Sequence, residues 1–118
     1  MRLICALAAA GAVALLATSP AAPITPPKLF GTVGPGFTIT LKQNGRAVKT
    51  LKPGSYTFVI SDKASIHNFV VEGPGVERDI TTPSFTGTKT VTIRLRKGKY
   101  KFYCRPHESS MFGFFTVT

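Results

Sequence analysis

Side chains that form disulfides or bind soft metals are scarce in this sequence. Its 118 residues contain no tryptophan and only two cysteines, two methionines and two histidines. Met1 and Cys5 lie in an apolar N-terminal segment, so a chain that loses this segment keeps one cysteine and cannot form an internal disulfide. The two histidines and the single remaining methionine also leave no room for a histidine-rich or methionine-rich metal tract.

Acidic residues are scarce as well. Five Asp and Glu stand against 15 Lys and Arg, which gives a formal net charge of +10. Such a charge favours acidic partners or anionic surfaces, including membranes. Nucleic acid is another partner of basic chains, but no nucleic-acid-binding motif is present and the N-terminal segment indicates export. We therefore expect no nucleic-acid partner.

The N-terminal segment is typical of a secretory signal. Arg2 precedes an apolar run from Leu3 to Leu16 and a stretch of small residues, with cleavage expected after Ala21. The alternative is an uncleaved membrane anchor, although the run is shorter than the ~20 residues of a typical span. We predict a signal peptide over 1–21, a proline-rich leader over 22–28 and one domain over 29–118. The protein is thus expected in the periplasm or outside the cell, with membrane attachment as the alternative.

Helical periodicity is absent after the leader, and short alternating patterns take its place. Phe37, Ile39 and Leu41 alternate with polar residues and are predicted to face a core. Asn44-Gly45 then predicts a hairpin turn, with Arg46–Leu51 as the return arm. After Tyr56-Phe58-Ile60 and His67-Phe69-Val71 we expect a loop over 72–87. The later alternating sets are Val91-Ile93-Leu95, Tyr100-Phe102-Cys104 and Met111-Gly113-Phe115-Val117.

Six to eight short strands of this kind predict an all-β fold, a Greek-key sandwich or barrel. Two segments echo each other, each with a leucine, a glycine turn and then Tyr and Phe two residues apart. Tyr56 and Tyr100 in these segments are predicted as corner tyrosines that hydrogen-bond to nearby backbone.

Five cations gather around the second of these turns. Arg94, Arg96 and Lys101 are predicted to face outward on the flanking strands, and Lys97 and Lys99 adjoin the turn. This basic patch is expected to be mainly at the end of the fold remote from Cys104. It is interpreted as a solvated surface, with docking of an acidic partner or a membrane as the alternative.

The soft donors outside the N-terminal segment form one pattern. Cys104, His107 and Met111 lie close together near the C-terminus, and strand parity points both Cys104 and the upstream His67 inward. A thiolate, two imidazoles and a weak axial thioether are the ligands of blue-copper electron-transfer sites. Zinc also binds Cys and His but is not selected by a thioether. The pattern therefore predicts a single copper site.

The segment 98–107, GKYKFYCRPH, followed by Met111-Phe112-Gly113 and Thr116-Val117, resembles the C-terminal signature of plastocyanin-type cupredoxins. His67-Asn68 resembles the upstream copper histidine and its asparagine, and 66–76 resembles small exported bacterial plastocyanin/azurin-like domains. The resemblance covers about Phe37 to Thr118. It implies His67, Cys104 and His107 as equatorial ligands of one type 1 copper and Met111 as the axial ligand. Asn68 would tie the upstream segment to the Cys104 loop by hydrogen bonds.

One spacing departs from plastocyanins, which usually have four residues between the second histidine and the methionine; this chain has three, Glu108-Ser109-Ser110. The resemblance implies a monomeric, exported one-electron carrier between redox partners, and no acid–base pair remains that would suggest an enzyme. His107 is expected to expose its ring edge in an apolar surface lined by Pro106 and Phe112, with Arg105 and Lys63 as rim charges. The alternatives are copper sequestration or delivery outside the cytoplasm and a metal-free structural domain on the same scaffold.

Overall fold

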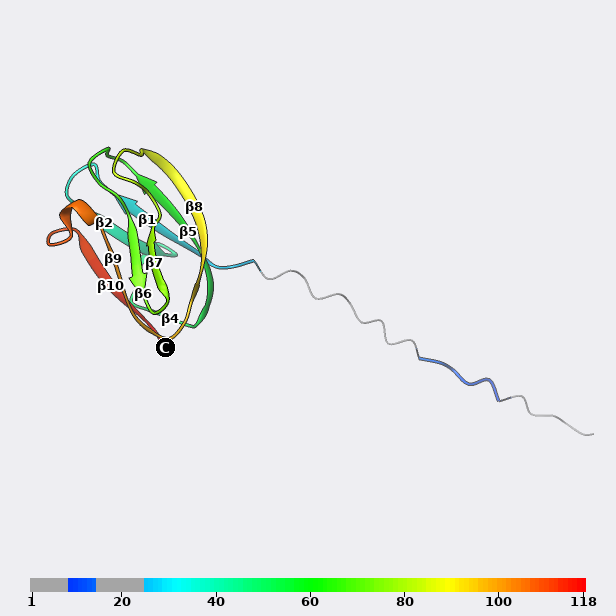
Figure 1. Ribbon diagram of the computed structural model, residues 1–118. Helices are drawn as coiled ribbons and strands as arrows, with labels where there is room; N and C mark the ends of the chain where they lie inside the picture. The colour runs from blue at the N-terminus through cyan, green and yellow to red at the C-terminus, as the bar shows by residue number, and fades with distance from the viewer. Residues whose placement is uncertain (1–8, 15–24) are drawn as a thin grey trace, which may run out of the picture.

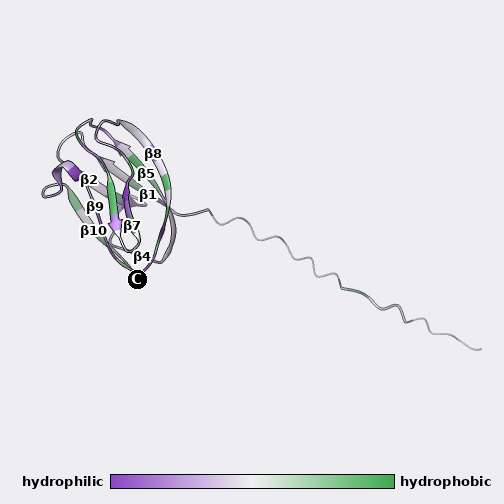
Figure 2. Cartoon of the chain, viewed as in Figure 1, coloured by the Kyte–Doolittle hydropathy of each residue, from purple (hydrophilic) through white to green (hydrophobic). Residues whose placement is uncertain are grey.

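Alternating apolar and polar side chains build two five-stranded sheets that face each other (Figures 1 and 2). The computed structural model describes residues 9–14 and 25–118. The first sheet has the order β3-β2-β1-β5-β8 and consists of β1 (Lys28–Val33), β2 (Ile39–Gln43), β3 (Arg46–Ala47), β5 (Gly54–Asp62) and β8 (Gly87–Leu95). The second has the order β4-β10-β9-β6-β7 and consists of β4 (Thr50–Leu51), β6 (Val70–Gly73), β7 (Val76–Asp79), β9 (Gly98–Tyr103) and β10 (Phe112–Val117).

The all-β prediction is confirmed. In the described part of the chain the one helical segment is η1 (Arg105–His107), a single 3₁₀ turn. The described residues form ten strands where six to eight were expected, because the return arm divides into β3 and β4 and the expected loop over 72–87 contains β7. The predicted signal peptide lies outside the described residues except for 9–14, as do residues 22–24 of the predicted leader. No helix among those described is long and apolar enough to span a bilayer.

The core fills the space between the sheets with inward side chains from both. Aromatic rings stack there, with Phe69 on Phe102 at 5.7 Å and Tyr100 on Phe115 at 5.1 Å between centroids. The hydroxyl of Tyr56 donates a hydrogen bond to the Lys52 carbonyl at 2.6 Å. The Tyr100 hydroxyl donates to the Arg96 carbonyl at 2.8 Å and accepts from the Arg96 N–H at 3.0 Å. Both corner tyrosines are therefore confirmed.

Three local predictions need correction. The Asn44-Gly45 turn forms with positive φ at both residues, but the return arm divides: β3 pairs with β2, whereas β4 crosses to the other sheet and pairs with β10. The expected loop over 72–87 contains β7, because Gly75 at φ +70° closes a tight hairpin with β6. Phe37 does not face the core, since β2 begins only at Ile39 and the Phe37 ring is 61% exposed.

Candidate metal centre

Four predicted ligand residues come from two separate stretches of chain at one end of the sandwich. His67 lies in the loop between β5 and β6, and the other three lie in the connection from β9 to β10. Cys104 follows β9 directly, His107 ends η1, and Met111 precedes β10. His67 is fully buried, as predicted. It does not belong to a strand, however, because β6 starts only at Val70. Strand parity therefore does not explain why its side chain points inward.

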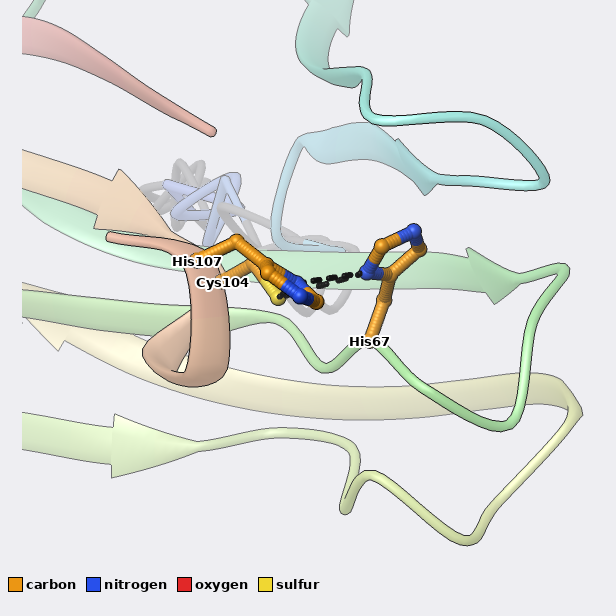
Figure 3. Close-up of side chains that lie close together, drawn as sticks. All are labelled: His67, Cys104 and His107. Atoms are coloured by element: carbon orange, nitrogen blue, oxygen red, sulfur yellow. Dashed lines mark hydrogen bonds between the residues drawn. The ribbon is translucent and has the colours of Figure 1, made fainter. Parts of the chain in front are cut away.

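The three nitrogen and sulfur donors form a compact triangle (Figure 3). The His67 and His107 Nδ1 atoms are 3.0 Å apart. The Cys104 Sγ lies 3.7 Å from the Nδ1 of His67 and 3.6 Å from the Nδ1 of His107. In Figure 3 the imidazole of His67 approaches from the side opposite to Cys104 and His107. His67 and His107 are 40 positions apart in the sequence, yet both direct their Nδ1 atoms toward the same point.

This triangle has the size of a metal site. A point equidistant from the three atoms is about 2 Å from each, close to the 2.0–2.1 Å of a zinc–nitrogen bond and slightly short of the 2.3 Å of a zinc–sulfur bond. A thiolate with two imidazoles in trigonal arrangement is the donor set of blue-copper sites. The donor residues therefore fit a copper ion in both type and spacing.

The buried ring of His67 is held by packing on its far side. Its Nε2 is buried and has no hydrogen-bond partner among the described residues, whereas metal-bound histidines usually donate their second N–H. Gly34, at φ +75°, lies against the ring: a Cβ there would be 3.2 Å from the His67 Cδ2. A glycine at this position therefore satisfies the backbone conformation and leaves space for the imidazole.

The loop that carries three of the predicted ligands is closed by its own backbone. The Cys104 N–H donates to the Met111 carbonyl at 3.0 Å, and the Met111 N–H donates to the His107 carbonyl at 2.9 Å. The His107 N–H donates to the Cys104 carbonyl at 3.1 Å, which forms the turn of η1. Met111 is 1% exposed and belongs to the same buried cluster as Cys104. These bonds fix the positions from which the sulfur and imidazole side chains project.

Asn68 joins the two stretches, as expected. Its backbone N–H points to the Cys104 Sγ at 3.5 Å, and its side-chain oxygen accepts from the Arg105 N–H at 2.7 Å. Its side-chain nitrogen donates to Asp79 Oδ2 at 3.2 Å. Asp79 was missed by the sequence analysis because the segment containing β7 was expected to be a loop. A hairpin prediction at Pro74-Gly75 would have placed it beside Asn68.

Arg105 is a paired residue and not a free rim charge. Its guanidinium donates to both oxygens of Asp79, at 2.6 and 3.1 Å, and to Glu77 at 3.4 Å. The hydrogen bond to Asp79 raises the pKa of Arg105 above its ordinary value. Loss of hydration raises the pKa of the neighbouring Tyr103, and the Arg105 charge opposes this rise. Arg105 thus anchors η1 to β7.

Phe37 covers the two imidazoles from the solvent side. Its ring meets His67 edge-on at 5.2 Å and His107 at 4.9 Å between centroids. Two further exposed apolar residues adjoin ligand positions in sequence, Ile66 at 53% and Phe112 at 46% exposure. His107 is half-buried and His67 fully buried. The sequence analysis missed this role because the alternation through Ile39 and Leu41 placed Phe37 in the core.

Similarity to known proteins agrees with this geometry. A family model described as copper binding proteins, plastocyanin/azurin family, matches residues 33–118. Auracyanin A, a "blue" copper protein from the green thermophilic photosynthetic bacterium Chloroflexus aurantiacus, has a TM-score of 0.55 at 17% identity, over 80% of this chain and 100% of its own. Auracyanin B gives 0.51 at 16% identity, over 82% and 93%. Rusticyanin of Thiobacillus ferrooxidans gives 0.52 at 18% identity, over 77% and 76%. These structures show the shared fold, and no curated protein sequence matches the chain.

Proposed function

Because the chain belongs to the plastocyanin/azurin family of copper-binding proteins, whose cofactor is copper, we propose that it is a one-electron carrier. Bound copper supplies the Cu(II)/Cu(I) couple. The protein would be an exported monomer that passes single electrons between redox partners and catalyses no reaction of its own. The apolar run at the N-terminus supports export to the periplasm or the cell exterior.

His67, Cys104 and His107 are proposed as the equatorial ligands, and Met111 as the axial ligand. The observation that carries this assignment is the triangle of two Nδ1 atoms and one Sγ with sides of 3.0, 3.6 and 3.7 Å. Met111 is the remaining soft donor in the described part of the chain, and the loop bonds to Cys104 and His107 hold its backbone beside them. In trigonal copper sites a long axial thioether completes the set.

Electron transfer is favoured by how tightly these side chains are held. Cys104 and His67 are fully buried, and Met111 is 1% exposed. Two hydrogen bonds fasten the loop of His67 to the loop of Cys104: Asn68 donates its N–H to the Cys104 Sγ and accepts from the Arg105 N–H with its side-chain oxygen. Donor atoms fixed in this way move little when the oxidation state changes, because packing holds the His67 ring and hydrogen bonds hold the backbone that carries the other donors.

Redox partners are proposed to dock over the metal end. His107 is half-buried, so among the three donors of the triangle it is the one nearest to solvent. Phe37, Ile66 and Phe112 expose apolar surface around it. An apolar patch of this kind excludes water from a contact and lets two redox centres approach closely.

The proposal is tested by adding Cu(II) to the purified protein. An intense blue thiolate-to-copper absorption is expected, and Cys104→Ser should abolish it because the thiolate is removed. Ser109→Ala, an exposed change in the same loop, is the matched control and should keep the colour. Reversible voltammetry with slow copper release would support a carrier, whereas rapid release would favour a protein that sequesters or delivers copper. A protein that stays colourless would contradict the proposal.

A further inference from the structure

Five cations surround the C-terminal end of β10, at the end of the sandwich opposite η1 (Figure 1). The last residues of β10 lie between two basic loops: Thr116 pairs with Thr50 on one side and Lys99 on the other. Thr116 also donates its N–H to the Lys49 carbonyl at 3.0 Å. This arrangement joins loops that are far apart in the sequence into one surface, here called the basic pole: Lys49, Lys52, Arg96, Lys97 and Lys99.

The charge of the basic pole is not compensated locally. All five side chains are exposed, and none forms an ion pair within the part of the chain that the structure describes. The sequence has no Asp or Glu before Asp62 and none between Asp79 and Glu108. Glu72 borders the pole by sharing a shallow pocket with Lys99. The other exposed carboxylates pair with Arg105 or Lys101, outside the pole: Glu77, Asp79 and Glu108.

The N-terminal segment joins the domain beside this pole. Pro26 and Pro27 line a shallow pocket together with Pro53 and Gly54, which follow Lys52 directly. The Pro27 carbonyl accepts a hydrogen bond from the Thr57 N–H at 2.8 Å. An apolar N-terminal segment that remained attached to the chain would therefore emerge close to the basic pole.

We propose that the basic pole binds the surface of an anionic lipid bilayer, which leaves the metal end facing away from the membrane. Lipid fits this surface better than a protein partner does. Protein interfaces are built around buried apolar or aromatic anchors, yet the loops Lys49–Lys52 and Arg96–Lys99 expose no large apolar side chain. The exposed ring that borders the pole, Phe114, lies beneath the ammonium groups of Lys99 and Lys101, at 4.8 and 5.9 Å. Adsorption to anionic lipid requires charge alone and gains about fivefold in affinity per cation. Phe37 and His107 at the other end stay accessible to redox partners.

Partitioning of the full-length chain into lipid vesicles tests this proposal. The probes are vesicles of phosphatidylcholine alone and of phosphatidylcholine with phosphatidylglycerol in equal parts, at low salt. The double variant Lys52→Gln/Lys97→Gln alters the pole. Its control is Lys63→Gln/Lys89→Gln, which removes two exposed lysines from the metal half: Lys63 follows β5 and Lys89 pairs with Ile60. Both variants lower the net charge equally and keep the same N-terminal segment.

We expect the wild type to prefer the anionic vesicles. The partition coefficient of the pole variant should fall about tenfold or more. The fall in the logarithm of the partition coefficient should be less than half as large for the control variant. Added salt should weaken the binding of the wild type, because the attraction is screened. Copper-free protein should behave like the copper form, so this result is independent of electron transfer.

Equal losses in the two variants, or no preference for anionic vesicles, would overturn the proposal. The proposal would also be overturned if the protein stayed bound to polyglutamate at a salt concentration that releases it from anionic vesicles. That result would favour an acidic protein partner.

Discussion

The side-chain oxygen of Asn68 accepts a hydrogen bond of 2.7 Å from the backbone N–H of Arg105, 37 residues along the chain. Asp79 supports both partners of this bond: it accepts from the Asn68 side-chain nitrogen at 3.2 Å and from the Arg105 guanidinium at 2.6 Å. One carboxylate on β7 therefore orients the link between the two segments that carry the proposed copper ligands.

Asp79→Ala is expected to destabilise the copper-free protein by about 1–3 kcal/mol, because the buried side-chain nitrogen of Asn68 loses its acceptor. The free energy of unfolding in urea measures this change. Glu77→Ala is the control: it removes only an exposed contact of 3.4 Å to the same arginine and should cost about 0–1 kcal/mol. Equal effects of the two variants would show that Asp79 acts only as a surface charge.

Phe37→Ala is expected to speed copper loss without unfolding the protein. The ring contacts both proposed histidine ligands edge-on, and aromatic contacts of this kind are worth about 0.5–1.5 kcal/mol, equivalent to at most about a tenfold change in rate. Transfer of Cu(I) to bicinchoninate measures this rate. Phe30→Ala removes a ring that is 51% exposed on β1 and should leave the rate unchanged. Unaltered copper loss in Phe37→Ala would contradict a shielding role.

Gly73→Ala is expected to be strongly destabilising. A Cβ at this position would overlap the ring of Tyr100, which is 1% exposed and stacked on Phe115. Overpacking of this kind costs about 1–3 kcal/mol or more, measurable as a lower midpoint of thermal unfolding. Gly36→Ala meets no atom within 4 Å and should leave that midpoint nearly unchanged. A neutral Gly73→Ala would mean that the Tyr100 ring, on the neighbouring strand β9 of the same sheet, shifts to admit the methyl group.

Tyr100→Phe should cost more stability than Tyr56→Phe. The Tyr100 hydroxyl is bonded to both the N–H and the carbonyl of Arg96, whereas the Tyr56 hydroxyl is bonded to a single carbonyl. Leaving two backbone groups without a partner is expected to cost about 1–3 kcal/mol, against about 0.5–1.5 kcal/mol for one ordinary hydrogen bond. Chemical denaturation of both variants gives the comparison, and the reverse order would refute this account of the two corners.

Much of the fold could be predicted from the sequence because strand alternation and turn chemistry are local signals. Asn44-Gly45 needs only its own backbone preference to form the observed turn. The crossing of β4 to the second sheet could not be predicted in this way, since it depends on the pairing of Thr50 with Thr116, 66 positions later. The displacement of Phe37 has the same origin: its ring packs on two imidazoles that other segments bring to that end.

The candidate site was predictable to a greater degree, because soft donors are rare in this chain and three of them are close in sequence. The direction of His67 was right for a wrong reason: the loop before β6 buries it, and strand parity does not extend that far. Asp79 and the pairing of Arg105 were not predictable without the β6–β7 hairpin. Local spacing identified the proposed ligands, whereas the bonds that orient them arise from tertiary structure.

The separation of His67 from His107 by 40 residues couples the completion of the candidate site to folding. An extended polypeptide offers the donors of Cys104, His107 and Met111 on the same short segment, which is three of the four proposed donors. The second nitrogen arrives only after β6 and β9 have come together in register. Coordination by all four proposed donors therefore reports that the sandwich has closed.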